Sequence, residues 1–101
     1  MPLVSEGVWE QPMKVIWTRH AEERQEEWEK KLGIRRQEVE EMLRNHEQIV
    51  PGDRDALIAQ ARRGSGLLRA AFVEVEGNRK VLTVYWTSKV EKYWKEEPDE
   101  G

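Results

Sequence analysis

The feature that most constrains this chain is a pair of β-prone runs separated by two turn-forming residues. Residues 72–76 alternate apolar and acidic side chains, residues 79–87 are rich in Val, Thr, Tyr and Trp, and Gly77-Asn78 lies between them. A two-residue turn between two such runs is typical of a β-hairpin. The C-terminal half of the chain is therefore predicted to contain paired antiparallel strands.

The turn also sets a register, and the register sets two faces. With Gly77 and Asn78 as the loop, Glu76 pairs with Arg79. One face then pairs Val75 with Lys80, Val73 with Leu82, Ala71 with Val84 and Arg69 with Trp86, and the other pairs Glu74 with Val81, Phe72 with Thr83, Ala70 with Tyr85 and Leu68 with Thr87. The first face is the more aliphatic, so we expect it to pack under the helices.

A strand that runs directly into a helix is predicted near the start of the domain. Residues 15–17 are β-prone, and Thr18 is a favourable N-cap for the helix that follows. The apolar stripe of that helix, at spacings of 4, 7 and 11 residues, consists of Ala21, Gln25, Trp28 and Leu32. Gly33 is expected to end the helix as a left-handed C-cap.

A second helix is predicted almost at once, although Arg35 is a poor N-cap for it. Its buried face consists of Val39, Met42 and Leu43, and it ends near Asn45, before a turn at residues 51–53. Residues 56–62 are ambiguous, because helix propensity favours a helix while the flanking turns allow an edge strand. Residues 88–91 form a capping-box pattern that predicts a short helix through Trp94.

These patterns together predict a core that joins both helices to one face of the sheet. The predicted core residues are Trp17, Trp28, Leu32, Val39, Leu43, Val73, Leu82 and Val84.

Length and composition limit the chain to one small domain. Its 101 residues are 38% hydrophobic and 37% charged, which suffices for a single core. We expect a flexible arm at residues 1–12, one α+β domain at residues 13–95 and a disordered acidic tail at residues 96–101. The absence of cysteine excludes disulfides and thiolate metal sites, and no apolar run is long enough to span a membrane, so a cytoplasmic protein is predicted.

The net charge of −3 conceals an uneven distribution. Residues 60–95 carry eight basic and three acidic side chains, whereas residues 1–59 and the acidic tail each sum to −4. The C-terminal half is therefore suited to attract an anion, while the rest of the chain repels one. Strong non-specific binding of nucleic acid is not expected.

Two groups of residues have the chemistry of a site. His20 and Arg24 lie one helical turn apart, where a proton carrier and a phosphate ligand would share a face. Arg69, Tyr85 and Lys89 lie near one end of the predicted hairpin and provide cations and a proton carrier, as metal-free phosphodiester cleavage requires.

Each group also has a purely structural interpretation. Arg24 is well placed to pair with Glu23 or Glu27, and Arg69 to stack on an aromatic ring such as Trp86. No metal or cofactor site is predicted, because the two histidines, His20 and His46, are 26 residues apart with no ligand cluster around them.

Several segments resemble a known family. These are residues 15–24 (VIWTRHAEER), residues 32–34 (LGI), residues 38–45 (EVEEMLRN), residues 66–69 (GLLR) and residues 81–85 (VLTVY). The chain resembles the domain-of-unknown-function family 4258, small bacterial proteins related to the BrnT and RelE-type toxins, over residues 14–95. The resemblance implies two helices packed on one face of a small antiparallel sheet, in the order β-α-α-β-β-β with a short C-terminal helix. It also implies that residues 57–62 form a strand.

Toxins of the RelE type are typically endoribonucleases that an antitoxin protein holds inactive, some of them dependent on the ribosome, while the ParE branch inhibits gyrase. The resemblance thus implies a metal-independent endoribonuclease that acts on mRNA, with His20 and Arg24 in the His-Ala-x-x-Arg motif and with Arg69, Tyr85 and Lys89 as the strand and post-strand positions. The competing hypothesis is a non-catalytic scaffold or protein-interaction module that uses Trp9, Trp86 or Trp94 at an interface. The sequence leaves the RNA substrate, the partner and the oligomeric state open.

Overall fold

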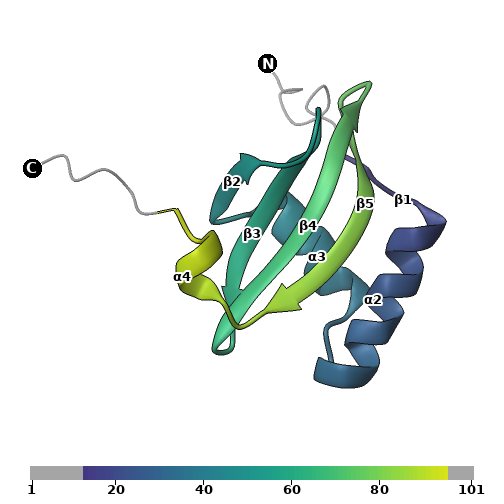
Figure 1. Ribbon diagram of the computed structural model, residues 1–101. Coiled ribbons are helices and arrows are strands. Elements are labelled where there is room, and N and C mark those ends of the chain that lie inside the picture. Colours follow the sequence, from purple (N-terminus) through teal and green to yellow (C-terminus); the bar gives the residue numbers. More distant parts are fainter. Residues whose placement is uncertain (1–12, 96–101) are drawn as a thin grey trace, which may run out of the picture.

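The computed structural model describes residues 13–95, and the predicted arm and acidic tail lie outside these residues. The fold is α+β, a five-stranded mixed sheet with helices packed on it (Figure 1). The elements in chain order are β1 (Val15–Trp17), α2 (Arg19–Leu32), α3 (Arg36–Arg44), β2 (Gln48–Pro51), β3 (Leu57–Arg63), β4 (Gly66–Val75), β5 (Asn78–Thr87) and α4 (Val90–Tyr93). The expected α+β order is confirmed, with one strand more than predicted.

The strand order in the sheet is β1-β5-β4-β3-β2. All neighbouring strands are antiparallel except β1, which runs parallel to β5 along residues 79–81. The expectation of a wholly antiparallel sheet was therefore wrong. The reason is that β1 is the first strand in the chain and reaches the edge of the last strand, a long connection that allows a parallel pair.

The additional strand, β2, was not predicted. The segment that contains it was interpreted as the end of a helix followed by a turn. It pairs antiparallel with β3, from Gln48 opposite Gln60 to Pro51 opposite Leu57. Four residues carry too short a pattern to indicate a strand by themselves. β3 confirms the strand that the family resemblance implied, and not the helix that propensity favoured.

The predicted boundaries of α2 and α3 are confirmed. The Thr18 hydroxyl accepts a hydrogen bond from the Ala21 backbone nitrogen at 3.1 Å and caps α2. Gly33 ends α2 in the left-handed conformation, and α3 begins after Arg35, which makes no side-chain cap. The capping box predicted for α4 is wrong, because Lys89 is the N-cap residue and no side chain caps that helix.

The hairpin between β4 and β5 forms, but in a different register. The loop is Glu76-Gly77, with φ of 54° and 81°, and Val75 pairs with Asn78. Two consecutive residues with positive φ define a type I′ turn, which matches the right-handed twist of the strands. The glycine therefore occupies the second turn position, one residue later in the loop than we expected.

A β-bulge lies at Leu82, where the register shifts between Ala71 and Phe72. Thr83 pairs with Ala71, Val84 with Ala70 and Tyr85 with Arg69. Beyond the bulge the pairing differs by one residue from the predicted one, so residues of β4 and β5 that were expected on opposite faces now share a face. Phe72 and Tyr85, which were expected on one face, lie on opposite faces.

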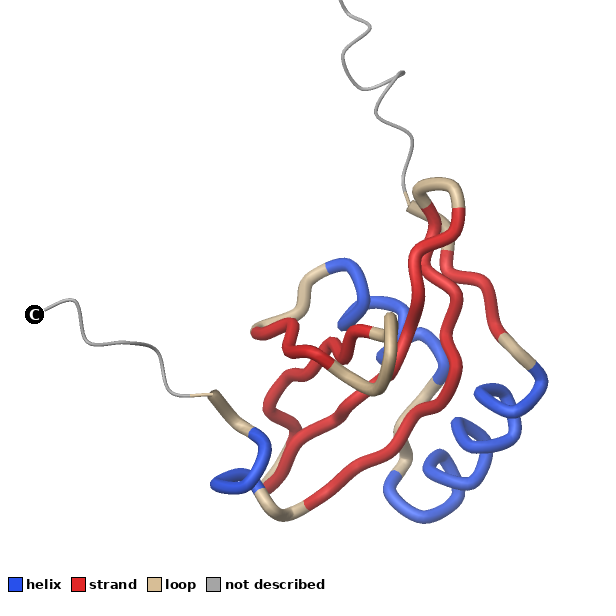
Figure 2. Tube along the Cα trace, turned by 45° about the horizontal axis from the view of Figure 1, so that its top comes forward, coloured by secondary structure: helices blue, strands red, loops and turns tan. Residues whose placement is uncertain are grey.

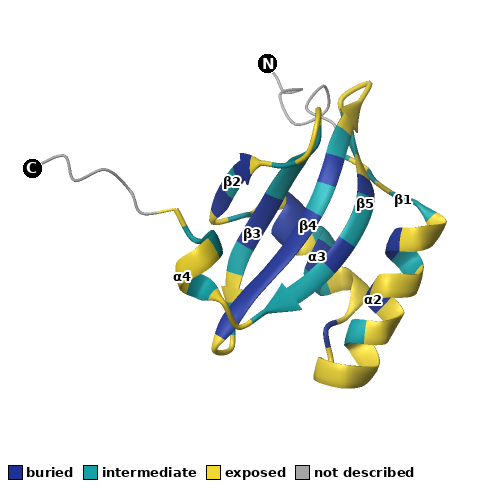
Figure 3. Ribbon diagram, viewed as in Figure 1, coloured by how far each residue is buried: buried dark blue, intermediate teal, exposed yellow. Residues whose placement is uncertain are grey.

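The core lies between the sheet and the two long helices, as the dark blue segments of Figure 3 show. Val39, Leu43 and Val84 are confirmed as core residues. Val73 and Leu82 were predicted wrongly, since Phe72 and Val81 are buried instead, and Leu32 is 39% exposed. Trp17 and Trp28 are partly buried against the core. The buried hydrophobic residues of this cluster are Ala21, Ile34, Val39, Met42, Leu43, Ala59, Leu68, Ala70, Phe72, Val81 and Val84.

The β4–β5 turn and α4 lie at opposite ends of the long strands (Figure 2). None of the helices within residues 13–95 combines the length and the apolar character that crossing a membrane requires.

Candidate functional site

The sheet face opposite α2 and α3, here called the outer face, carries a buried arginine. Arg69 is 4% exposed, and its Nε donates a hydrogen bond to Gln60 Oε1 at 2.8 Å. Its Nη1 donates to the hydroxyl of Tyr85, the residue directly opposite on β5. Arg69 and Tyr85, which the sequence analysis placed in one candidate group, are therefore in direct contact.

Aromatic rings complete the surroundings of this guanidinium. The Arg69 guanidinium carbon lies 4.0 Å from the ring centre of Tyr93 and 5.4 Å from that of Tyr85. The two tyrosine rings meet edge to face, with centres 6.5 Å apart. Arginine thus stacks on aromatic rings, as the structural interpretation expected, although the rings are Tyr85 and Tyr93 and not Trp86.

Beside Arg69 the outer face is hollowed. The hollow has a volume of about 1010 Å³ and is lined by apolar side chains of β3, β4 and β5, by the loop after β2 and by the three residues Arg69, Tyr85 and Tyr93. Thr83 and Arg54 also line it. The hollow thus combines two cations, the carboxylate of Asp53 and two phenols on a partly apolar floor, which suits a ligand that has both polar groups and a flat ring.

His20 and Arg24 lie in the helix layer. Both are exposed on α2, and Arg24 pairs with Glu27 at 2.9 Å, the ion pair that the structural interpretation allowed. β1 meets β5 at the pair of Trp17 with Val81. Tyr85 is four residues further along β5, or about 13 Å in an extended strand, and it lies on the opposite face. The structure brings Arg69 and Tyr85 together and does not bring His20 and Arg24 to them.

Lys89 lies elsewhere on the surface. It is the exposed N-cap residue of α4, and it lines a separate hollow with Ser65, Ser88, Val90, Glu91 and Lys92. The cation that does share the Arg69 hollow is Arg54, in the loop between β2 and β3.

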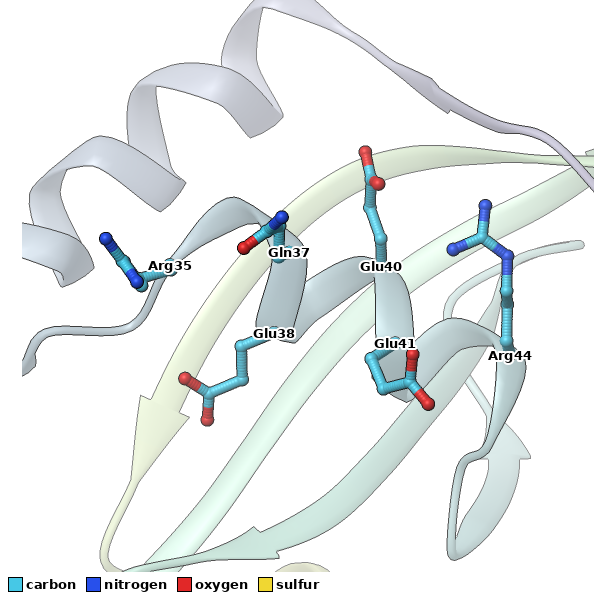
Figure 4. A pocket seen from close by; sticks show the side chains of 6 residues that line it. All are labelled: Arg35, Gln37, Glu38, Glu40, Glu41 and Arg44. Carbon is cyan, nitrogen blue, oxygen red and sulfur yellow. The ribbon is translucent and has the colours of Figure 1, made fainter.

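A further hollow of about 550 Å³ lies along α3 and the residue before it. Figure 4 shows its six lining residues, Arg35, Gln37, Glu38, Glu40, Glu41 and Arg44. All three carboxylates have partners, because Glu41 accepts from the Asn45 amide at 2.6 Å, Glu38 pairs with Arg63 at 2.7 Å and Glu40 accepts from the Trp17 indole at 2.7 Å. The last two contacts tie α3 to β3 and β1, so this surface stabilises the fold.

Within residues 13–95, no cluster of three or more metal-ligating side chains is present. Sequence reasoning missed four residues around Arg69, namely Gln48, Gln60, Arg54 and Tyr93. The polar residues inside the strands 48–51 and 57–63 were a signal, since a glutamine at a buried strand position needs a partner.

Comparison with family models, with curated proteins and with solved structures finds no match for this chain. The geometry defines a small mixed α+β domain with an arginine–tyrosine pair in an outer-face hollow. The resemblance to the toxin-related family stays a prediction from the sequence.

Proposed function

We propose that this protein is a toxin-like RNA-binding domain of RelE or BrnT type that cleaves RNA without a metal ion, in the hollow of the outer face. The observation that carries the proposal is the contact between the Arg69 guanidinium and the Tyr85 hydroxyl at the wall of that hollow. A cation beside a proton carrier is the minimum that phosphodiester cleavage needs.

The chemistry follows from these two groups. The ribose 2′-oxygen attacks the adjacent phosphorus and gives its proton to water, and the bond from phosphorus to the 5′-oxygen breaks. The Tyr85 hydroxyl gives its proton to the leaving 5′-oxygen, and the Tyr85 oxygen regains a proton from water. Arg69 faces the negative charge that develops on the phosphoryl oxygens. Tyr85 takes the proton-carrier role that the sequence assigned to His20, because Tyr85 is the residue that contacts Arg69.

The surroundings of the pair favour RNA as the ligand. Tyr93 offers a ring for stacking with a base, and Arg54 adds a second positive charge to the rim of the hollow. By analogy with toxins of this type, the natural partners we propose are an antitoxin protein and RNA, free or on the ribosome.

The second candidate function is a protein-interaction module, and a specific observation favours it. Two nitrogens of Arg69 already donate to Gln60 and Tyr85, and its side chain is almost fully buried. An arginine held in this way can serve the fold of the outer face without binding a phosphate.

RNA binding and cleavage by purified variants separate the two functions. We expect the wild-type protein to cleave single-stranded RNA in the presence of a chelator. Arg69→Met should lose cleavage and lower the slope of log affinity against log salt by about 0.7, the value for one phosphate contact on a single strand. Tyr85→Phe should lose cleavage and keep the salt slope, because it removes a hydroxyl and no charge.

Arg24→Met is the matched control, since it removes the same charge from the helix layer, where Arg24 pairs with Glu27. It should cleave like the wild type. Cleavage that needs a divalent metal would contradict the proposal. So would cleavage that is lost in His20→Ala and kept in Tyr85→Phe. Folded wild-type protein that neither binds nor cleaves RNA would favour the interaction module.

A growth assay provides an independent test. Overproduction of the wild-type chain in a bacterium should slow growth, and the Arg69→Met and Tyr85→Phe variants should relieve the effect at equal protein level. Equal toxicity of the wild type and both variants would exclude the proposed site as its cause.

A further inference from the structure

Four polar residues form a row across four neighbouring strands. Gln48 of β2 is paired with Gln60 of β3, Gln60 with Arg69 of β4, and Arg69 with Tyr85 of β5. Side chains directly opposite each other on one face are close enough to interact. Hydrogen bonds join each pair along this row, from Gln48 to Tyr85.

We infer that Gln60, held by Gln48, is a positioning residue that fixes the Arg69 guanidinium against Tyr85 and thereby directs the Tyr85 hydroxyl proton into the hollow. This inference rests on the proposed function of the outer face as the RNA site. It assigns a purpose to two buried glutamines that the proposed reaction does not use directly.

The burial of Gln60 shows that its contacts matter. Its side chain is fully buried, and its amide oxygen accepts from Arg69 Nε at 2.8 Å. Its amide nitrogen donates to Gln48 Oε1 at 2.7 Å and to the Tyr93 carbonyl at 3.1 Å. An unpaired amide at this position would be costly, so each of these bonds constrains the next one.

The direction of the row follows from Arg69, because a guanidinium only donates hydrogen bonds. The oxygen of the Gln60 amide must therefore face Arg69, and its nitrogen must face Gln48. Gln48 must in turn present its oxygen to Gln60, which leaves its nitrogen for the Lys95 carbonyl at 2.5 Å. Both amide orientations are thus determined, with no freedom to rotate by 180°.

The same argument applies at the other end of the row. The Tyr85 oxygen accepts from Arg69 Nη1, so its own proton points away from the guanidinium. Tyr85 lines the hollow. A hydroxyl that is oriented in this way is a hydrogen-bond donor toward a ligand oxygen, which is the role that protonation of the leaving 5′-oxygen requires.

Exchange of the Arg69 Nε proton, measured by ¹⁵N NMR, tests the positioning without RNA. A guanidinium proton that is buried in a hydrogen bond exchanges slowly with water. We expect a protected Arg69 signal in the wild type, assigned by its loss in Arg69→Met, and exchange at least tenfold faster in Gln60→Met. Unchanged protection in Gln60→Met would overturn the inference.

The matched control is Gln25→Met, which removes another buried amide, one that donates to the Ile34 carbonyl in the helix layer. It should leave the Arg69 signal unchanged. The conservative variant Gln60→Glu keeps an acceptor for Arg69 Nε and should retain the protection. If Gln60→Met does not fold, Gln60→Glu and Gln48→Met replace it, and the protection must fall in Gln48→Met and persist in Gln60→Glu.

RNA measurements then separate this inference from the proposed function. Gln60→Met should weaken RNA binding about tenfold with an unchanged salt slope, since the charge of Arg69 is kept, whereas Arg69→Met lowers the slope. If Gln60→Met loses the protection of the Arg69 signal and the wild type does not bind RNA, the proposed function is refuted and the positioning role of Gln60 is supported. RNA binding that is equal in Gln60→Met and the wild type would overturn the positioning alone.

Discussion

Gly66 is the position where the smallest substitution should have the largest effect on stability. It is the first residue of β4, and it is buried next to Trp86 and Thr87 of β5. A Cβ at this position would collide with the backbone carbonyl oxygen of Thr87 and would lie 2.5 Å from Trp86 Cζ2 and 2.8 Å from Trp86 Cε2. The reason for glycine here is the close approach of the paired strand.

The cost of Gly66→Ala can be estimated from these contacts. Carbon atoms in contact are normally about 3.5–4.0 Å apart, so the indole must move by about 1 Å. Trp86 resists this movement because its Nε1 donates to the Arg63 carbonyl at 2.9 Å, and Thr87 is part of the sheet ladder. Overpacking of this kind lowers the free energy of unfolding by about 1–3 kcal/mol. Gly66→Ala belongs at the upper end of this range, because one of the obstructing atoms is a backbone oxygen that cannot rotate away.

Thermal and urea unfolding should measure this loss. About 3 kcal/mol corresponds to a fall in Tm of roughly 12–24 °C for a domain of this size. The control is Gly64→Ala, since a Cβ at Gly64 meets no atom within 4 Å but the residue has φ of 62°. The left-handed conformation alone costs about 1–2 kcal/mol. A Gly66→Ala variant as stable as Gly64→Ala, or more stable, would refute the close-contact argument.

Three further substitutions test the packing of the helix layer on the sheet, and a fourth, on the outer face, is their control. Thr18→Ala should lower the free energy of unfolding by about 1–2 kcal/mol, because the hydroxyl caps α2 and also donates to the Val81 carbonyl at 2.8 Å. Leu43→Ala and Val84→Ala should each cost about 2–4 kcal/mol, as expected for cavities at fully buried positions. Leu82→Ala, on the outer face, should cost less than either in the same urea titration, and an equal cost would place Leu82 in the core.

The boundaries of the helices were predictable because their signals are local. Thr18 and Gly33 act through contacts with residues a few positions away, so the sequence contains everything needed to find them. β2 had no such signal, because a four-residue strand depends on its partner β3 for its definition. A parallel edge strand such as β1 is likewise defined by contacts with residues more than sixty positions away.

The register of the hairpin was not predictable from the turn dipeptide alone. A glycine supplies positive φ at either position of a two-residue loop, and the two choices give different pairings. In the structure Glu76 also adopts positive φ, which is unfavourable for a residue with a side chain. Burial compensates for this cost, since the observed register places Phe72 and Val81 in the core.

The candidate site depends on the same register. The predicted pairing placed Arg69 opposite Trp86, on the face that was to pack under the helices, where a guanidinium would face an apolar core. In the structure, the face of β4 that carries Arg69 is the outer face, and the observed pairing sets Arg69 opposite Tyr85 and beside Gln60. A charged residue in the middle of β4 was therefore a usable constraint on which face of that strand packs under the helices, and applying it would have turned Ala70 and Phe72 to the core. The contact between Arg69 and Tyr85 then follows from the sheet itself, because directly paired residues on one face meet without any further element to align them.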